Sequence, residues 1–342
     1  MTPLSAPAST PPATLAQLRV DAAVRFVLDS LWGTTLDGIA GVTGIDMLAS
    51  PFMQRAYLAA ICIAVIGALV GSFLVHREMA MIGDTLAHSA FAGVAVGLFV
   101  NATFGVVVAP LLTALLVAAV AALLVQSLVD YAGAYRDTSL AIVLTGSFAV
   151  GSVLVTATDG GIAVGINAYL FGSLATVSRL NAAILLVLSV VVTAVVAVAY
   201  RPLVFVTVDE IGARAAGLNV VRYNQLLAVL TAVVVVGAMQ IMGVILVAGM
   251  LVIPVAAATP VRGFKRAIGG AVGAGLIATT TGVTLSYQYD IAAGGTIVLV
   301  AIALYTGSKL SVRVRHRLAR RTQASSAAAA SQPATADGGE DK

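Results

Sequence analysis

The chain has 342 residues, of which 60% are apolar and only 10% carry a charge. One soluble core cannot bury so much apolar surface, so the composition excludes an ordinary soluble globular protein and predicts a polytopic membrane protein. The formal net charge is +4, but the basic residues lie at the ends of apolar segments and form no single stripe. This placement argues against a nucleic-acid-binding protein. We therefore expect an all-α bundle of transmembrane helices.

Residues 1–50 are predicted to form an extension ahead of the membrane domain. Residues 1–14 are rich in Pro, Ala, Ser and Thr, which is typical of disordered chain. Residues 18–31 place apolar side chains at helical spacing with charged residues between them, which predicts an amphipathic helix on the membrane surface. No basic segment followed by an apolar run is present here, so we expect insertion through the first hydrophobic helix rather than a cleaved signal peptide.

The predicted membrane domain, residues 51–311, contains nine apolar segments. Most approach the roughly 20 residues that a helix needs to cross a bilayer. Residues 224–258 predict either two tightly turned helices or one helix and a re-entrant segment, so eight and ten spans are the alternatives to nine. The nine segments are 56–75, 79–100, 104–127, 139–157, 180–199, 224–239, 241–258, 268–286 and 293–310.

Glycines recur at four-residue spacing within several of these segments. Such pairs let helices approach closely in lipid, so they predict bundle packing. The pairs are Gly67/Gly71, Gly93/Gly97 and Gly269/Gly273.

The basic residues between segments predict the orientation. If the loop at Arg77 is cytoplasmic and the spans alternate, the opposite side beyond the first span holds only Arg179. The N-terminus is then outside and the C-terminus in the cytoplasm of a multi-pass cell-membrane protein. The tail, 312–342, is expected to be basic and anchored to lipid headgroups at first, then disordered. The cytoplasmic side holds Arg136, the loops 201–222 and 262–266, and the tail from Lys309.

The most unusual polar residues are Asp84 and His88, four positions apart in the apolar segment 79–100. On a helix they share one face. For a span that starts at Glu78, they lie about 9 Å and about 15 Å along the axis, and the second value is about half of a core about 30 Å thick. A charge at such depth costs about 2.5 to 3.5 kcal/mol, so it usually has a function or a partner. A carboxylate with an imidazole suits Zn²⁺ or Mn²⁺.

A structural alternative is that Gly83 breaks the chain and Asp84 caps a helix that begins at Thr85. This alternative leaves His88 unexplained. In the metal interpretation two ligands make a weak site, as a transported ion requires. Water, or the same pair from a second subunit, would complete the coordination shell.

Three other features are candidates for function. Asp290, at an outer helix end, is predicted to be a vestibule carboxylate or a cap, and Pro254 is predicted to kink its helix, which suits a gate. The longest internal loop on the cytoplasmic side predicts a short helix along the membrane, which docks a partner or only decorates the loop. The residues that indicate it are Asp209, Glu210, Arg214 and Gly217.

Several motifs in order resemble the permease subunits of metal-ion ABC transporters, the ABC-3 family of zinc, manganese and iron importers. The resemblance covers about 55–310. The matching stretches are MIGDTLAH at Met81–His88, AYLFGSL at Ala168–Leu174, ARAAG at Ala213–Gly217, LVIP at Leu251–Pro254, and Tyr289 with Asp290.

This resemblance implies a homodimeric permease that is not itself an enzyme. It implies two cytoplasmic ATPase subunits docked around 210–218, and an extracellular metal-binding protein that delivers the ion. Asp84 and His88 match the metal site of the family's translocation path. Some zinc-type members carry a His-Ser pair where this chain reads LTGSF at 144–148, so zinc, manganese and iron remain alternatives.

The sequence therefore predicts a permease that imports Zn²⁺ or Mn²⁺, with Fe²⁺ as a further alternative, and that holds no permanent cofactor. The phosphate-binding motif GxxxxGK[ST] is missing, so ATP is expected on another chain, and the missing HExxH argues against an intramembrane hydrolase. The alternatives are a permease for metal chelates of the B12 or siderophore type, and an ATP-independent carrier or channel with Asp84 as a proton relay. An imported ion is expected to meet His88 before Asp84.

Overall fold

A computed structural model describes most of the chain, and all regular structure in the described part is helical. The predicted amphipathic helix at 18–31 lies outside this part. The described residues are 32–43, 46–106, 108–130, 135–157, 169–172, 177–261 and 263–330.

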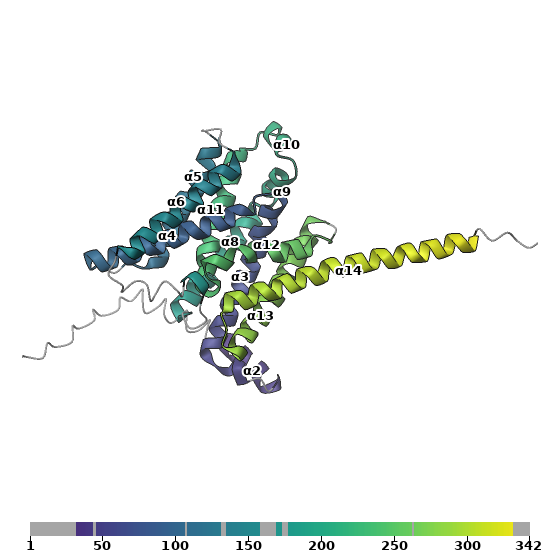
Figure 1. The fold of residues 1–342 in the computed structure, drawn as a ribbon, viewed down its shortest axis with the longest axis horizontal. Helices are drawn as coiled ribbons and strands as arrows, with labels where there is room; N and C mark the ends of the chain where they lie inside the picture. Colours follow the sequence, from purple (N-terminus) through teal and green to yellow (C-terminus); the bar gives the residue numbers. More distant parts are fainter. Residues whose placement is uncertain are drawn as a thin grey trace, which may run out of the picture.

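The apolar segments of the sequence form the main helices of the bundle (Figure 1). They are α3 (Pro51–His76), α4 (Met81–Phe104), α5 (Pro110–Asp130), α6 (Arg136–Thr156), α8 (Arg179–Val198), α11 (Val220–Met242), α12 (Val244–Ala258), α13 (Phe264–Tyr289) and α14 (Ala293–Ala330). Among the described residues, eight of these helices are long and apolar enough to cross a membrane, and α12 is a shorter apolar helix. The predicted all-α bundle is confirmed, with nine apolar helices among the described residues. The last predicted span is the first half of α14, which continues to Ala330.

Shorter helices lie before and between these. A helix α2 (Thr34–Thr43) and a 3₁₀ turn η2 (Asp46–Ala49) precede α3, and α9 (Tyr200–Val208) and α10 (Glu210–Ala215) connect α8 to α11. In Figure 1, α2 and α10 lie at opposite ends of the bundle.

The central helix is α3, which contacts α8, α11, α12 and α13. It is apolar on all sides and therefore needs protein around it. Its large side chains Met53, Ile63 and Phe73 are at most 1% exposed. Helices α4, α5 and α6 pack together on one side of the bundle, and α13 and α14 pack on the other (Figure 1).

Close approach of helix backbones depends on particular glycines. A Cβ at Gly71 of α3 would collide with the carbonyl oxygen of Leu251 on α12, and one at Gly93 of α4 would collide with the backbone of α5. These contacts confirm the packing predicted for the first two glycine pairs. For Gly269 and Gly273 that expectation was wrong, because nothing lies within 4 Å of a Cβ at either position.

The chain reverses between α11 and α12 at a single residue, Gly243, whose φ of 78° favours glycine. Helix α12 then runs parallel to α14, and its 15 residues cover the same length as 294–308 of α14. The segment 224–258 therefore forms two tightly turned helices. Three contacts mark the register of α12 and α14: Met242 with Gly294, Gly249 with Val298, and Ala257 with Ser308.

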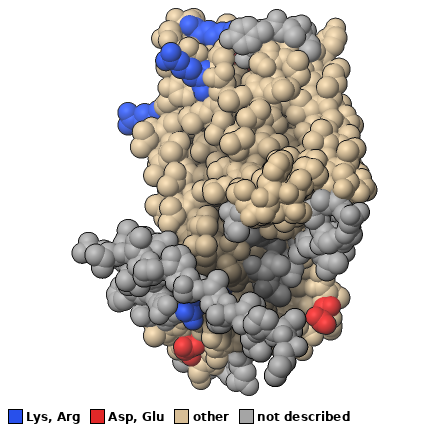
Figure 2. Space-filling model, turned by 90° about the vertical axis from the view of Figure 1, so that its left-hand side faces the viewer, with Lys and Arg blue, Asp and Glu red and all other residues tan. Residues whose placement is uncertain are grey.

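The loops that were predicted to share one side of the membrane do meet at one end of the bundle. The guanidinium group of Arg77 lies 3.4 Å from the carboxylate of Glu210, and the ring of His76 lies 5.0 Å from that of Phe264. We call this end the basic end. It carries Arg77, Arg136, Arg214, Lys265 and Lys309. Figure 2 shows most of the visible Lys and Arg atoms at one end of the face that it draws.

Candidate metal site and docking helix

Helix α4 positions Asp84 and His88. It begins at Met81 and follows a four-residue turn after α3, so Asp84 lies within its first turn and is not its N-cap. The capping alternative is therefore wrong. In the turn itself, Glu78 has a left-handed backbone with φ 57°, and the buried Met79 donates its N–H to the Leu74 carbonyl at 2.9 Å.

The geometry of His88 suits a metal ligand. Its Nδ1 lies 3.0 Å from the carbonyl oxygen of Asp84 and 3.5 Å from Oδ1 of the same residue. When Nδ1 carries the proton and donates it to the carbonyl oxygen, Nε2 keeps its lone pair for an ion. Metal-binding histidines are usually oriented by such a hydrogen bond from the other ring nitrogen.

The side chains of Asp84 and His88 are partly open at the surface of the single chain, with 36% and 20% of their area exposed. In the described part of the chain, no group of three or more His, Cys, Asp or Glu side chains could hold a metal ion. One chain thus brings two candidate ligands together, and both are partly exposed.

Two residues of α6 that the sequence did not single out individually complete the surroundings. The ring of Phe148 meets the imidazole of His88 edge-on at 5.5 Å and stacks on Phe91 at 5.6 Å. The hydroxyl groups of Ser89 and Ser147 lie 2.9 Å apart and join α4 to α6. Both α6 residues belong to the LTGSF stretch. Their positions beside His88 and Ser89 follow from the packing of α6 against α4 and are not visible in the sequence.

The other two candidates lie on α12 and at the end of α13. Asp290 is the C-cap of α13, exposed and in the left-handed conformation with φ 51°. It lies at the end opposite the basic end, because its neighbour Tyr287 contacts the ring of Phe52 at the start of α3. Pro254 is buried inside α12. Asp290 is therefore at the other end of the bundle from Arg77, whereas α12 packs against the start of α4, where a Cβ at Gly83 would meet the side chain of Leu251.

The predicted short helix is present as α10. The Asp209 carboxylate accepts a hydrogen bond from the Gly212 N–H at 2.8 Å and so caps its start, and Gly217, with φ 83°, follows its end. Ala213 packs against Val206 and Val220 on the inner side. On the outer side Ile211 is 83% exposed, an apolar side chain available to a partner.

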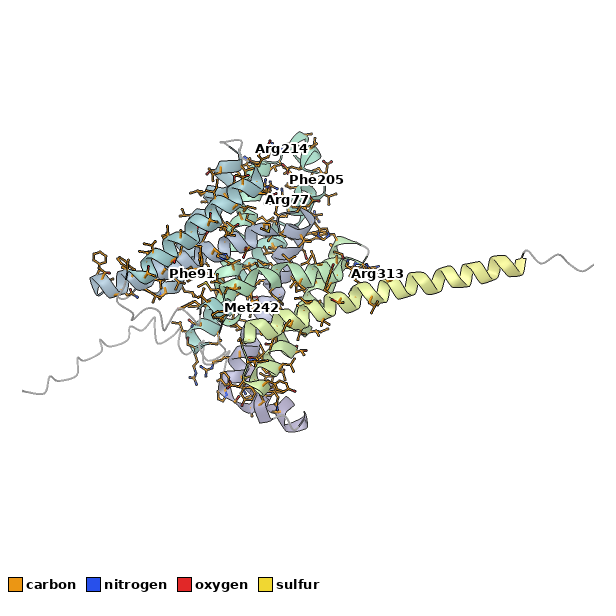
Figure 3. The ribbon with its side chains drawn as sticks, in the orientation of Figure 1. Arg77, Phe91, Phe205, Arg214, Met242 and Arg313 are labelled. Carbon is orange, nitrogen blue, oxygen red and sulfur yellow. The ribbon has the colours of Figure 1, made fainter. Side chains whose placement is uncertain are left out.

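An ion pair connects α10 to the turn before α4. Glu210 bonds Arg214 at 2.7 Å and Arg77 at 3.4 Å. The bond from Arg214 and the nearby charges of Arg77 and Arg136 hold the pKa of Glu210 below its usual value. The Arg77 side chain is only 5% exposed, and burial lowers its pKa. Figure 3 shows Arg77 and Arg214 close together at the α10 end.

The long apolar helices of the described residues define a multi-pass membrane protein. The chain belongs to the ABC 3 transport family, which matches residues 49–311.

Two curated relatives extend this finding. A manganese transport system membrane protein, MntC, from Halalkalibacterium halodurans is 31% identical over 82% of this chain and 96% of its own length. A probable iron transport system membrane protein from Haemophilus influenzae is 29% identical over 53% of this chain and 67% of its own length.

A solved structure of PsaBC from Streptococcus pneumoniae in complex with Fab is similar in fold, with a TM-score of 0.69 and 26% identity. The match covers 77% of this chain and 92% of that one.

Proposed function

We propose that the chain is the permease subunit of an ATP-driven importer for a divalent transition metal ion, with Asp84 and His88 as its ligands for the ion. The observation that carries the proposal is the free Nε2 of His88, held beside the Asp84 carboxylate inside an apolar helix. Family membership and relatives named for manganese and iron transport support it.

Mn²⁺ is the cargo that this reasoning favours. One carboxylate and one imidazole suit a moderately hard divalent ion, and the α6 segment beside His88 supplies a phenyl ring and a serine but no further imidazole. Fe²⁺ is the second choice and Zn²⁺ the third. All three are transported substrates and not resident cofactors.

A second copy of the chain completes the site in this proposal. Asp84 and His88 face outward from the single chain, so a two-fold axis passing near them would supply four protein ligands. Charged groups at membrane depth normally face a partner or a cavity, and the second copy provides that partner.

Two cytoplasmic ATPase subunits, one for each permease copy, would dock on α10 through Asp209, Glu210, Ile211 and Arg214. The basic end then faces the cytoplasm, in line with the positive-inside rule. The N-terminus is outside. An extracellular metal-binding protein delivers the ion to the same side of the membrane. Asp290, at the outer end, is a vestibule carboxylate in this arrangement, and Pro254 is a gate residue of α12.

The proposed cycle moves the ion from His88 to Asp84 and into the cytoplasm. When the ATPases close, they push α10, and the Glu210–Arg77 ion pair transmits this movement to the turn before α4. The ion leaves because the site binds it less tightly in the inward-open state than in the outward-open state.

The test is uptake of Mn²⁺ by the complete transporter reconstituted in vesicles. The double variant Asp84→Ala, His88→Ala should lose uptake. The matched control is Thr145→Ala, an exposed hydroxyl on α6 that bonds only the carbonyls of its own helix, and it should keep uptake. Full uptake by the double variant would overturn the site. Uptake of a metal chelate in place of the free ion, or uptake without ATPase subunits, would favour one of the two alternative functions.

A further inference from the structure

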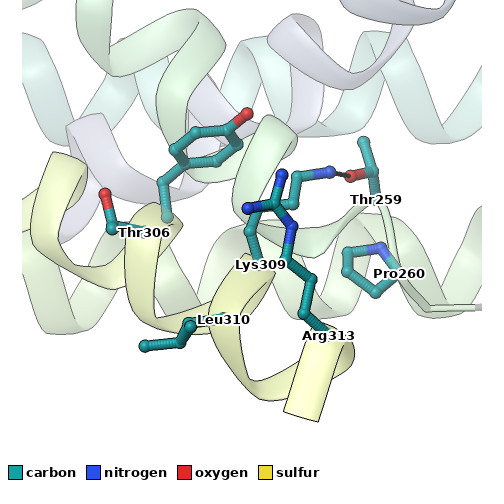
Figure 4. A pocket seen from close by; sticks show the side chains of 7 residues that line it. Thr259, Pro260, Thr306, Lys309, Leu310 and Arg313 are labelled. Carbon is teal, nitrogen blue, oxygen red and sulfur yellow. Dashed lines mark hydrogen bonds between the residues drawn. The ribbon is translucent and has the colours of Figure 1, made fainter. Parts of the chain in front are cut away.

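A hollow of about 640 Å³ lies between the end of α12 and the middle of α14. Figure 4 shows the side chains that surround it: Thr259 and Pro260 after α12, and Thr306, Lys309, Leu310 and Arg313 on α14. The ring of Tyr305 lines the same space. This hollow is separate from the Asp84–His88 pair and plays no part in the proposed transport path.

Two cations on one face of α14 dominate the hollow. The ammonium group of Lys309 donates a hydrogen bond to the hydroxyl oxygen of Thr259 at 2.9 Å and lies 5.5 Å from the centre of the Tyr305 ring. Arg313 is exposed, one helical turn further along, and lines the same space. None of the described residues that line the hollow is a carboxylate.

Neither cation is compensated by an acid in the described part of the chain, where the ion pairs are those of Arg77, His88 and Arg214. Lys309 is also not needed to cap α12, because other groups serve its last carbonyl oxygens. The Ser308 hydroxyl bonds the Ala257 oxygen at 2.7 Å, and the Thr259 hydroxyl bonds the Ala256 oxygen at 2.8 Å. Both positive charges are thus available to an anion.

The position of the hollow indicates which anion. The part of α14 that is apolar enough to cross a membrane ends at Ser311, so Lys309 and Arg313 lie on either side of the expected boundary between hydrocarbon and headgroups. Leu310, Pro260 and the Tyr305 ring supply apolar surface beside the charges. A soluble anion would make no favourable contact with that apolar surface. A phospholipid has a phosphate for the cations and acyl chains for the apolar side chains.

We propose that this hollow binds the phosphate headgroup of an anionic phospholipid from the leaflet at the basic end. The phosphate lies between Lys309 and Arg313, whose ammonium and guanidinium groups donate hydrogen bonds to its oxygens. The glycerol and acyl chains lie along Leu310 and Pro260. Basic pockets between transmembrane helices on the cytoplasmic side are suited to such headgroups. A bound lipid would join the end of α12 to α14.

The test measures binding of phosphatidylglycerol to the full-length, delipidated permease in mild detergent, by native mass spectrometry and by titration. The double variant Lys309→Gln, Arg313→Gln should bind roughly 10- to 30-fold more weakly, because each cation near a headgroup contributes about 5-fold and the two factors multiply. The matched control Lys265→Gln, Arg266→Gln removes two exposed charges at the same end but outside the hollow, and its affinity should change by less than about 2-fold.

Four further measurements make the result decisive. The charge-preserving variant Lys309→Arg, Arg313→Lys should retain binding, and the single variant Arg313→Gln, at an exposed position, should show part of the loss even if the double variant folds poorly. Phosphatidylcholine should bind all variants equally. Equal losses in the double variant and the control, or unchanged binding by the double variant, would overturn the site. Complete competition by millimolar inorganic phosphate would show a soluble-anion site and overturn the lipid proposal.

Discussion

At the scale of single residues, Phe148 illustrates what a contact adds to a sequence motif. The spacing of Asp84 and His88 was enough to predict that they share a helical face, because that geometry is local. The ring that holds the His88 imidazole comes from a residue 60 positions later, and no local pattern places it there. The orientation of the proposed ligand therefore depends on how α6 packs against α4.

We predict that Phe148→Ala weakens ion binding without preventing transport. Without the phenyl ring the imidazole of His88 can rotate, and losing a residue that orients a ligand typically costs about 10- to 100-fold in metal affinity. The apparent KM for Mn²⁺ uptake by the reconstituted transporter should rise by about 10-fold or more, with a smaller effect on the maximal rate. Val153→Ala, which trims a side chain 65% exposed further along α6, is the control. An equal KM for both variants would mean that Phe148 has no orienting role.

At the scale of elements, the sequence predicted most helices because each crossing needs a long apolar run, and such a run is visible without any tertiary information. The sequence alone does not decide how the chain turns between α11 and α12, because the residues that determine this turn are far apart in the sequence. Gly243 fits against the carbonyl oxygen of Leu170, and Gly172 against that of Ile241. Two segments about 70 positions apart determine this turn together. The wrong expectation for Gly269 and Gly273 has the same origin, since spacing does not say whether a partner helix is present.

The link between α10 and α4 gives a prediction for these elements. Because the pKa of Glu210 is lowered in the folded chain, its ionised form stabilises the fold above the ordinary glutamate range, and this contribution is lost as the pH falls through the lowered value. A spin label at Ile211, introduced as Ile211→Cys with the buried Cys62 replaced by alanine, should become more mobile as the pH falls below about 4.5.

Two variants decide whether the Arg77–Glu210 ion pair causes this change. Arg77→Gln should already raise the mobility of the label at pH 7, because Arg77 ties α10 to the turn before α4. Glu210→Gln should be mobile at pH 7 and should change little on acidification, since it has no carboxylate to protonate. A label that stays immobile in Arg77→Gln would show that α10 is held without this ion pair, for example by the packing of Ala213. A label that still responds to acid in Glu210→Gln would assign the response to another carboxylate, such as the Asp209 cap.

At the scale of the whole molecule, the distribution of polar groups argues that one chain is half of the functional unit. The bundle buries its apolar core around α3, yet it leaves Asp84 and His88 partly exposed on α4. A monomer would present a carboxylate to lipid, at a cost of about 2.5 to 3.5 kcal/mol. In the proposed dimer, a second copy covers this face, which removes the cost and adds two candidate ligands.

The metal stoichiometry follows from this argument and can be measured. The purified complex, equilibrated with Mn²⁺ and washed free of excess ion, should hold one ion for every two permease chains, since a single shared site uses both Asp84–His88 pairs. In a heterodimer of tagged wild-type chain and His88→Ala chain, three ligands remain, so binding should weaken but persist, whereas two His88→Ala chains should bind far more weakly. One ion per chain, with equal affinity in the mixed dimer and the wild type, would show that each copy holds its ion alone. The two-fold site would then be wrong, while Asp84 and His88 would remain candidate ligands within a single chain.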